Sequence, residues 1–242
     1  MRGLIISRLP ISLLVRPSIS SAAISRSQRV LWLLEELGLQ YELRTYKRDP
    51  KTSLAPPELI QVHPLGKSPV ITENGNTVAE SGAIVEYLLD AHAVRQGKSY
   101  LRPPPNTPER LRFTYWLHFA EGSAMPFLLL KLVFDKVRKA RVPFFVKPVV
   151  KSITAKVEDS FVMPNIKRQL AYIEAELGRE PWFAGQDFSA ADIQMSFPLE
   201  AAAARLGMGS SYPQIADWLA RIHDRPAYKK ALEAGGPYAL VR

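Results

Sequence analysis

The first ninety residues alternate between helical and extended patterns, and this alternation restricts the possible folds more than any other feature. Residues 27–38 place apolar side chains at helical spacing and end at a glycine, whereas residues 41–47 alternate as a strand does. Asn74-Gly75 is a strong signal for a tight turn between two short strands. The expected order is a helix at 27–38, a strand at 41–47, a short helix at 55–64, strands at 68–73 and 76–80, and a helix at 80–92.

The remainder of the chain is helical in pattern, after a stretch rich in proline and polar residues. If a strand precedes residue 27, the first part has the β-α-β-α-β-β-α order of a thioredoxin-type domain. We therefore predict an α/β thioredoxin-like N-terminal domain followed by an all-α C-terminal helical bundle domain. The predicted boundaries are 1–24 for an atypical N-terminal extension or first strand, 25–93 for the thioredoxin-like domain, 94–106 for the linker and 107–242 for the helical domain.

Composition excludes several classes of function. The chain has no cysteine, so disulfide scaffolds, zinc–thiolate sites and catalysis by a protein thiol are excluded, and we expect no bound metal. The net charge of +9 is concentrated in residues 1–34, which carry +5, and residues 131–156, which carry +7, leaving −3 elsewhere. A nucleic-acid-binding protein would present a broader basic surface, so we expect no nucleic-acid partner.

The N-terminal residues are rich in arginine and serine and contain no acid, as mitochondrial targeting peptides are. Pro10 and Pro17 interrupt any long amphipathic helix there, which argues against targeting. We expect a cytoplasmic protein, with mitochondrial or endoplasmic-reticulum association as the alternatives.

Two short motifs eleven residues apart carry the chemistry. Lys67-Ser68-Pro69 precedes a strand, and Glu80-Ser81 stands at a helix start. A cis Ser68–Pro69 bond, which costs only about 0.5–1 kcal/mol, would turn the Ser68 backbone outward to pair with an extended peptide. The helix start at Ser81 offers free N–H groups to a carboxylate, Glu80 can accept from an ammonium, and Lys67 can pair with a second carboxylate.

This set of groups matches the charges of γ-Glu-Cys-Gly, which has two anionic ends and one cationic group along an extended backbone. Taken singly, Ser81 is explained as a helix cap and Lys67 as a solvated charge. Their combination, order and spacing favour a binding site for glutathione over those separate explanations.

At these residues the sequence resembles the glutathione transferase superfamily. The resemblance covers residues 25 to about 230. Within the superfamily, the sequence is similar to the fungal and bacterial group typified by the yeast endoplasmic-reticulum-associated glutathione transferase. The resemblance is carried by SRSQRVLWLLEELGLQYEL, YKRDPKTSLAPPELIQVHPLGKSPV, AESGAIVEYLL and FSAADIQMSFPL. It implies a homodimer in which Glu80 and Ser81 bind the γ-glutamyl end, Ser68 the cysteinyl backbone and Lys67 the glycine carboxylate.

The resemblance also implies a serine just after the first strand whose hydroxyl donates to the glutathione sulfur. The Ser-x-x-x-Arg pattern at Ser25 and Arg29 fits that role, with Ser27 as the second candidate and helix capping as its alternative role. A free thiol with a pKa of about 8.5 is mostly protonated at neutral pH. One hydrogen bond to the charged sulfur, worth about 1.5–3 kcal/mol, lowers that pKa by roughly one to two units.

Ser189-Ala190-Ala191-Asp192 is a variant of the helix capping box, with Phe188 and Ile193 placed as its hydrophobic staple. We predict a structural role for Ser189 and Asp192, and likewise for Pro69.

The basic stretch 131–156 contains interspersed aromatic and aliphatic residues. The resemblance implies that this region shapes the pocket for an electrophile. From composition alone it is either a solvated helical insert or a peripheral contact with a membrane surface.

Two functions of different class follow from these observations. The first is an enzyme that adds the glutathione thiolate to a small hydrophobic electrophile, in detoxification or fungal secondary metabolism, with peroxidase side activity as an extension. Tyr115, Trp116 and Phe119 are candidate walls of the electrophile site. The second is a non-catalytic binding or assembly module with the same fold. A glutathione-dependent isomerase or disulfide reductase is weaker, because the cysteine that such enzymes use is absent.

Overall fold

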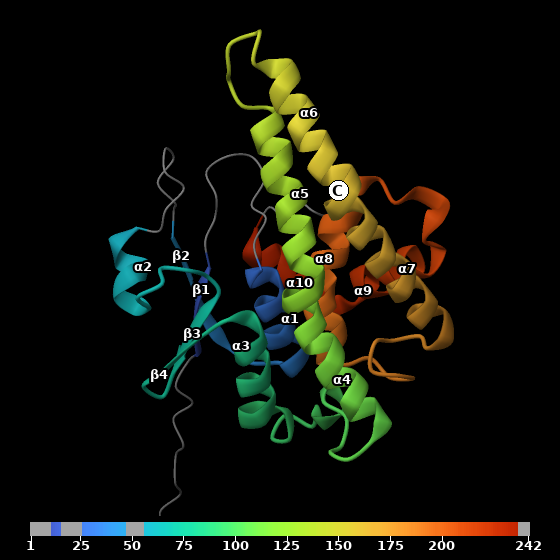
Figure 1. Cartoon of the computed structure of the whole chain (residues 1–242). Helices are drawn as coiled ribbons and strands as arrows, with labels where there is room; N and C mark the ends of the chain where they lie inside the picture. Colours follow the sequence, from blue (N-terminus) through green and yellow to red (C-terminus); the bar gives the residue numbers. More distant parts are fainter. Residues whose placement is uncertain (1–10, 16–25, 47–55, 237–242) are drawn as a thin grey trace, which may run out of the picture. The chain divides into compact units, whose positions relative to one another are not determined.

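The computed structural model describes residues 11–15, 26–46 and 56–236, which form two compact units (Figure 1). The first unit consists of Met1–Arg102 with His223–Arg242, and the second of Pro103–Ile222.

The first unit contains a four-stranded sheet in the order β2-β1-β3-β4. β1 is parallel to β2 and antiparallel to β3, and β3 and β4 form the antiparallel hairpin predicted around Asn74-Gly75. Both turn residues have positive φ, 51° and 81°, as a tight hairpin turn requires. β1 lies within 1–24, where the sequence allowed either an extension or a first strand. The strands are β1 (Ile11–Val15), β2 (Tyr41–Thr45), β3 (Val70–Glu73) and β4 (Asn76–Ala79).

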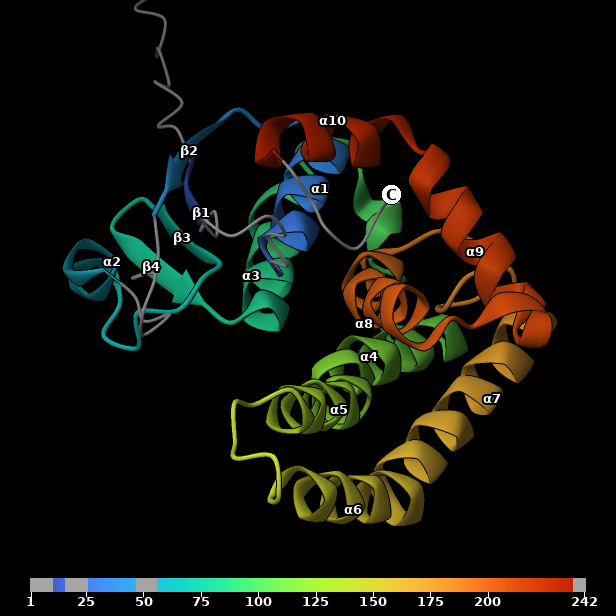
Figure 2. The same cartoon turned by 90° about the horizontal axis from the view of Figure 1, so that it is seen from above.

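Helices cover both faces of this sheet, with α2 on one side and α1 and α3 on the other (Figures 1 and 2). The helix predicted at 27–38 is confirmed: α1 ends at Gly38, whose φ of 66° lets its N–H bond back to the carbonyls of Leu34 and Glu35. The helices are α1 (Ser27–Leu37), α2 (Pro57–Val62), α3 (Ser81–Leu88) with its π-helical continuation η1 (Leu89–Ala93), the short 3-10 turn η2 (Ser99–Leu101) and α10 (Pro226–Gly235).

The last helix belongs to the first unit, although the predicted helical domain ran to residue 242. α10 packs along α1, whose residues are almost all buried. The rings of Trp32 and Tyr228 meet edge to face, with centroids 5.0 Å apart. Arg225 donates to both carboxylate oxygens of the buried Glu36, at 2.6 and 2.9 Å, and the Trp32 indole N–H donates to Glu36 at 2.9 Å. α1 has apolar side chains on more than one side, so a second element besides α3 must cover it. That element, α10, follows Arg225, which is 189 residues from Glu36 in the chain, so local sequence patterns do not predict the contact.

We expect Arg225→Ala to lower the free energy of unfolding by about 3 kcal/mol, because it leaves the buried Glu36 carboxylate without its cation. Chemical denaturation monitored by tryptophan fluorescence measures this change. Lys229→Ala is the matched control on the same helix, since its ion pair with Asp224 is exposed and should contribute little. Equal effects of the two substitutions would contradict the assignment of α10 to this packing.

The second unit is built from two long, continuous helical segments that flank a buried central helix. Each segment contains a π-helical turn that is followed within two residues by a proline, Pro126 or Pro164. Proline lacks an N–H and excludes the carbonyl four residues before it, so a regular turn cannot pass through these points. The elements are α4 (Pro108–Phe119), η3 (Ala120–Ala124), α5 (Met125–Arg138), α6 (Lys147–Val157), η4 (Glu158–Val162), α7 (Met163–Arg179), α8 (Ala190–Leu206), the 3-10 turn η5 (Gly209–Ser211) and α9 (Pro213–Asp224).

By length and composition alone the helix from Pro108 to Arg138 could cross a membrane, and 28% of its most apolar window is buried in the protein. A single helix that meets this criterion is weak evidence for a membrane span, and this one packs on α8. All residues of α8 from Ala190 to Ala202 are buried, which makes it the core of the unit.

The capping box at the start of α8 is present. Ser189 is the N-cap residue, and its N–H donates to the Asp192 carboxylate at 2.9 Å. The same carboxylate accepts from the Phe183 N–H and from the Trp218 indole N–H, both at 3.0 Å. Asp192 thus joins the start of α8 to the loop before it and to α9.

Candidate functional site

The two motifs singled out in the sequence meet at one end of the β3–β4 hairpin. Val70 is paired with Ala79, and the Cα atoms of such a pair are about 5 Å apart. Pro69 directly precedes Val70 and Glu80 directly follows Ala79, so both lie at this end of the hairpin. The Ser68–Pro69 peptide bond is cis, as the sequence suggested. Pro69 and Glu80, eleven residues apart in the chain, therefore lie side by side at the end of two paired strands.

Glu80 turns the chain from β4 into α3 without an intervening loop. Its backbone has φ 68° and ψ 122°, a conformation that residues with a side chain rarely adopt. Such backbone strain is concentrated at functional sites, because only a function or a rigid surrounding structure maintains it. The Glu80 side chain is exposed, and its carbonyl accepts from the Ile84 N–H at 2.9 Å.

Ser81 is the first residue of α3 and is buried, 4% exposed. The first N–H groups of a helix have no partner within the helix, and the helix dipole makes this end positive. A carboxylate is therefore stabilised at this position.

Lys67 is exposed and follows a tight turn closed by a hydrogen bond from the Gly66 N–H to the His63 carbonyl at 2.8 Å. Gly66 has φ 56°, which a glycine adopts without strain. The site thus combines a cation, an exposed carboxylate and a helix start. Among the residues that the structure describes, no group of three or more His, Cys, Asp or Glu side chains is arranged to hold a metal ion.

A buried polar brace holds α3 and its continuation to the hairpin. The Glu73 carboxylate accepts from the Tyr87 hydroxyl at 2.9 Å and contacts His92 Nε2 at 3.0 Å. Burial, together with the hydrogen bond to Glu73, raises the pKa of Tyr87. No local pattern in the sequence indicates that Glu73 is the common partner of Tyr87 and His92, which follow it by 14 and 19 residues.

The candidates for the sulfur contact are placed unequally. Ser25 lies outside the residues that the structure describes. Ser27 is the first residue of α1 and is fully buried, and Arg26 rather than Ser27 is the N-cap residue. Leu14 pairs with Val70, so the chain leaves β1 at the same end of the sheet as Pro69 and Glu80.

The aromatic residues proposed as walls of an electrophile site have different environments. Trp116 is buried and stacks on Tyr172 at 5.5 Å and against Phe183 at 4.7 Å, so it is part of the core between α4 and α7. Tyr115 is exposed and Phe119 is half-buried, with their ring centroids 5.6 Å apart. These two remain available to a ligand.

A thioredoxin-type sheet that carries a cis-proline loop beside a helix start, followed by an all-helical unit, defines the class of two-domain thioredoxin-fold proteins. Family models agree with this architecture: the glutathione S-transferase N-terminal domain matches residues 22–90, and the glutathione S-transferase C-terminal domain matches residues 137–226. The chain belongs to the glutathione S-transferase family.

Relatives cover most of the chain. Glutathione S-transferase 3 of Schizosaccharomyces pombe is 34% identical over 209 residues, which are 86% of this chain and 84% of the relative. Glutathione S-transferase 1 of Saccharomyces cerevisiae is 32% identical over 217 residues, 86% of this chain and 91% of the relative.

Solved structures show the same fold. A glutathione S-transferase from Actinobacillus pleuropneumoniae has a TM-score of 0.70 at 29% identity and covers 96% of both chains. A glutathione transferase from Phanerochaete chrysosporium, solved in complex with oxidized glutathione, has a TM-score of 0.69 at 25% identity and covers 93% of this chain and 96% of that one. The predicted fold class and the resemblance to fungal members are confirmed.

Proposed function

We propose that this protein is a glutathione transferase that adds the glutathione thiolate to a small hydrophobic electrophile. The observation that carries the proposal is the meeting of Lys67-Ser68 with Glu80-Ser81 at one end of the hairpin, imposed by the pairing of Val70 with Ala79. The S. pombe and S. cerevisiae relatives named as glutathione S-transferases support the same activity.

In the proposed complex the helix start at Ser81 binds the γ-glutamyl carboxylate, and Glu80 accepts from the γ-glutamyl ammonium. The Ser68 backbone pairs with the cysteinyl residue, and Lys67 pairs with the glycine carboxylate. These contacts hold the cysteinyl sulfur toward the end of β1. A serine hydroxyl from the segment between β1 and α1, with Ser25 as the first candidate, donates to the sulfur and stabilises its thiolate form.

The thiol proton passes to solvent on ionisation, so no general base is needed for the attack. The thiolate then forms the carbon–sulfur bond as the bond to a leaving group such as chloride breaks or, in an addition, as the carbon–carbon π bond opens and the adjacent carbon takes a proton from water. Tyr115 and Phe119 are the aromatic residues with surface available to an apolar electrophile. We propose detoxification or secondary metabolism as the setting, with glutathione peroxidase activity as a side reaction. We also propose a homodimer, and the exposed apolar residues Leu111 and Leu129 on the long helix are candidates for its interface.

Retention on immobilised glutathione together with turnover of a chlorodinitrobenzene-type substrate tests the proposal. Lys67→Gln removes the cation for the glycine carboxylate, so we expect KM for glutathione to rise about tenfold with little change in kcat, because a hydrogen bond to a charged group is worth about 1.5–3 kcal/mol. Lys230→Gln, an exposed lysine of α10 in the same unit, is the control.

Two outcomes would contradict parts of this proposal. Retention without turnover of any electrophile tested would favour the non-catalytic binding module. Absence of retention, with the fold intact by circular dichroism, would refute the glutathione site itself.

A further inference from the structure

We propose that the tip of the α5–α6 hairpin, residues 139–153, is a docking surface for membranes that contain anionic lipid. α5 and α6 run side by side, and the connection between them lies at the end of the pair away from α4 and α7 (Figures 1 and 2). The inference is independent of the proposed glutathione site, which lies in the first unit.

The tip exposes large apolar side chains. Phe144 and Phe145 are 83% and 68% exposed, and their rings pack edge to face with centroids 5.6 Å apart. Val149 and Ile153, one helical turn apart on α6, are 56% and 60% exposed. Together they form an apolar strip that runs from the connection onto the helix.

The same hairpin carries a concentration of positive charge. Residues 136–157 contain seven lysines and arginines and no acid. Of these, Arg138 pairs with Glu158, and within the described part of the chain the other six form no ion pair. The uncompensated cations are Lys136, Lys139, Arg141, Lys147, Lys151 and Lys156.

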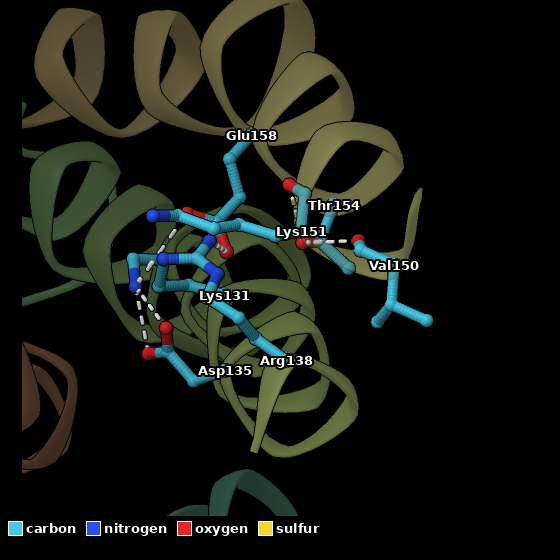
Figure 3. A network of polar contacts seen from close by, with 7 residues as sticks. All are labelled: Lys131, Asp135, Arg138, Val150, Lys151, Thr154 and Glu158. Carbon is cyan, nitrogen blue, oxygen red and sulfur yellow. Dashed lines mark hydrogen bonds and ion pairs between the residues drawn. The ribbon is translucent and has the colours of Figure 1, made fainter. Parts of the chain in front are cut away.

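The base of the hairpin is held together by a polar network, drawn in Figure 3. The buried Glu158 accepts from Arg138 and lies 3.8 Å from Lys131, which donates to Asp135 at 2.6 and 2.7 Å. Thr154, 2% exposed, donates to the Val150 and Lys151 carbonyls at 2.9 and 3.1 Å. The contacts of Glu158 with Arg138 and Lys131 join η4, which continues α6, to α5. The two Thr154 hydrogen bonds lie within α6 itself.

The combination of cations with aliphatic and aromatic anchors favours a lipid surface over the other occupants. Phosphate head groups neutralise the cations, while Phe and Ile side chains enter the boundary with the acyl chains. A single-stranded nucleic acid would use the aromatic rings but would gain nothing from Val149 and Ile153. A second copy placed symmetrically on the tip would bring its own Lys139 and Arg141 against those of the first copy.

Vesicle sedimentation with the full-length protein tests the proposal. We expect binding to phosphatidylcholine vesicles that contain phosphatidylserine, weak binding to pure phosphatidylcholine, and a marked loss of binding at high salt. Phe144→Ser with Phe145→Ser, and separately Lys139→Gln with Arg141→Gln, exposed cations of the connection, should each reduce the affinity at least about tenfold. The matched controls are Lys167→Gln with Arg168→Gln, exposed cations on α7, and Val94→Ser, an exposed apolar residue of the first unit. They should bind as the unmodified protein does, and retention on glutathione checks folding independently.

Insertion itself is measured with Phe145→Trp. Its fluorescence should shift to shorter wavelength on anionic vesicles and be quenched by brominated acyl chains, whereas the native tryptophans of the unmodified protein should not be quenched. Absence of binding to anionic vesicles at low salt would overturn the proposal, as would an equal loss of binding in the control variants. A change from dimer to monomer in the Phe144/Phe145 variant, measured by light scattering and without any vesicle binding, would overturn it too. Tighter binding to RNA than to anionic vesicles would also overturn it.

Discussion

Asp192→Ala is expected to lower the free energy of unfolding by about 4 kcal/mol, the largest effect of any single substitution considered for this protein. The carboxylate is fully buried and accepts from the N–H groups of Phe183 and Ser189 and from the Trp218 indole. Alanine leaves these buried donors unsatisfied, at a cost of about 1–3 kcal/mol each, and removes the helix cap. Alanine also removes the cost of burying the carboxylate, and this gain offsets part of the loss. Asp187→Ala, an exposed acid nearby, is the control and should leave stability unchanged.

The same residue predicts a pH dependence of stability. Burial raises the pKa of Asp192 to about 6 from 3.8, and its four hydrogen bonds only partly oppose that rise. Between pH 4 and 6 the folded state therefore keeps a proton that the unfolded state has released, so the contribution of Asp192 to stability falls as the pH rises, by about 3 kcal/mol over this window. Above the folded pKa the contribution is constant.

Comparison with Asp192→Asn isolates this effect from other titrating groups. The difference in unfolding free energy, unmodified protein minus variant, should decrease from pH 4 to pH 6 and then remain level. A difference that increases with pH over this range would mean that the folded state stabilises the carboxylate, contrary to the prediction.

Ser25→Ala is expected to reduce kcat/KM for conjugation at least about tenfold while leaving the glutathione affinity nearly unchanged. The lost hydrogen bond is worth about 1.5–3 kcal/mol to the thiolate and contributes little to holding the peptide. The pH profile of kcat/KM should shift upward by roughly one unit, because the bound thiol then ionises less readily. Such a shift would not follow from a purely structural role.

Ser27→Ala is the matched comparison. Ser27 is fully buried at the start of α1, so we expect its replacement to affect stability more than the pH profile. Loss of activity in Ser27→Ala with none in Ser25→Ala would reverse the assignment. If neither variant loses activity, the assignment of the sulfur contact to Ser25 or Ser27 is refuted.

The local elements of the first unit were predictable because their signals lie within a few residues of one another. Backbone preferences of the residues themselves determine three of these elements. They are the end of α1 at Gly38, the turn at Asn74-Gly75 and the helix that begins with a proline at 57–62. The capping box at Ser189 and Asp192 is of the same kind.

Long-range partners were not predictable in this way. No pattern near Glu36 indicates that Arg225, 189 residues later, is its partner, or that α10 returns to cover α1. The common acceptor role of Glu73 and the indole bond from Trp218 to Asp192 likewise depend on which surfaces meet after the chain has folded.

The sequence by itself determined the order of elements, the residue types of the glutathione site and the concentration of positive charge in residues 131–156, because these follow from local propensity and composition. Only the tertiary structure decided which residues meet: the pairing of Val70 with Ala79 brings Lys67-Ser68 beside Glu80-Ser81, and the packing of α6 on α5 leaves Phe144, Phe145 and their neighbours exposed. The physical reason is that pairing and burial depend on surfaces far apart in the chain, whose complementarity no local pattern records.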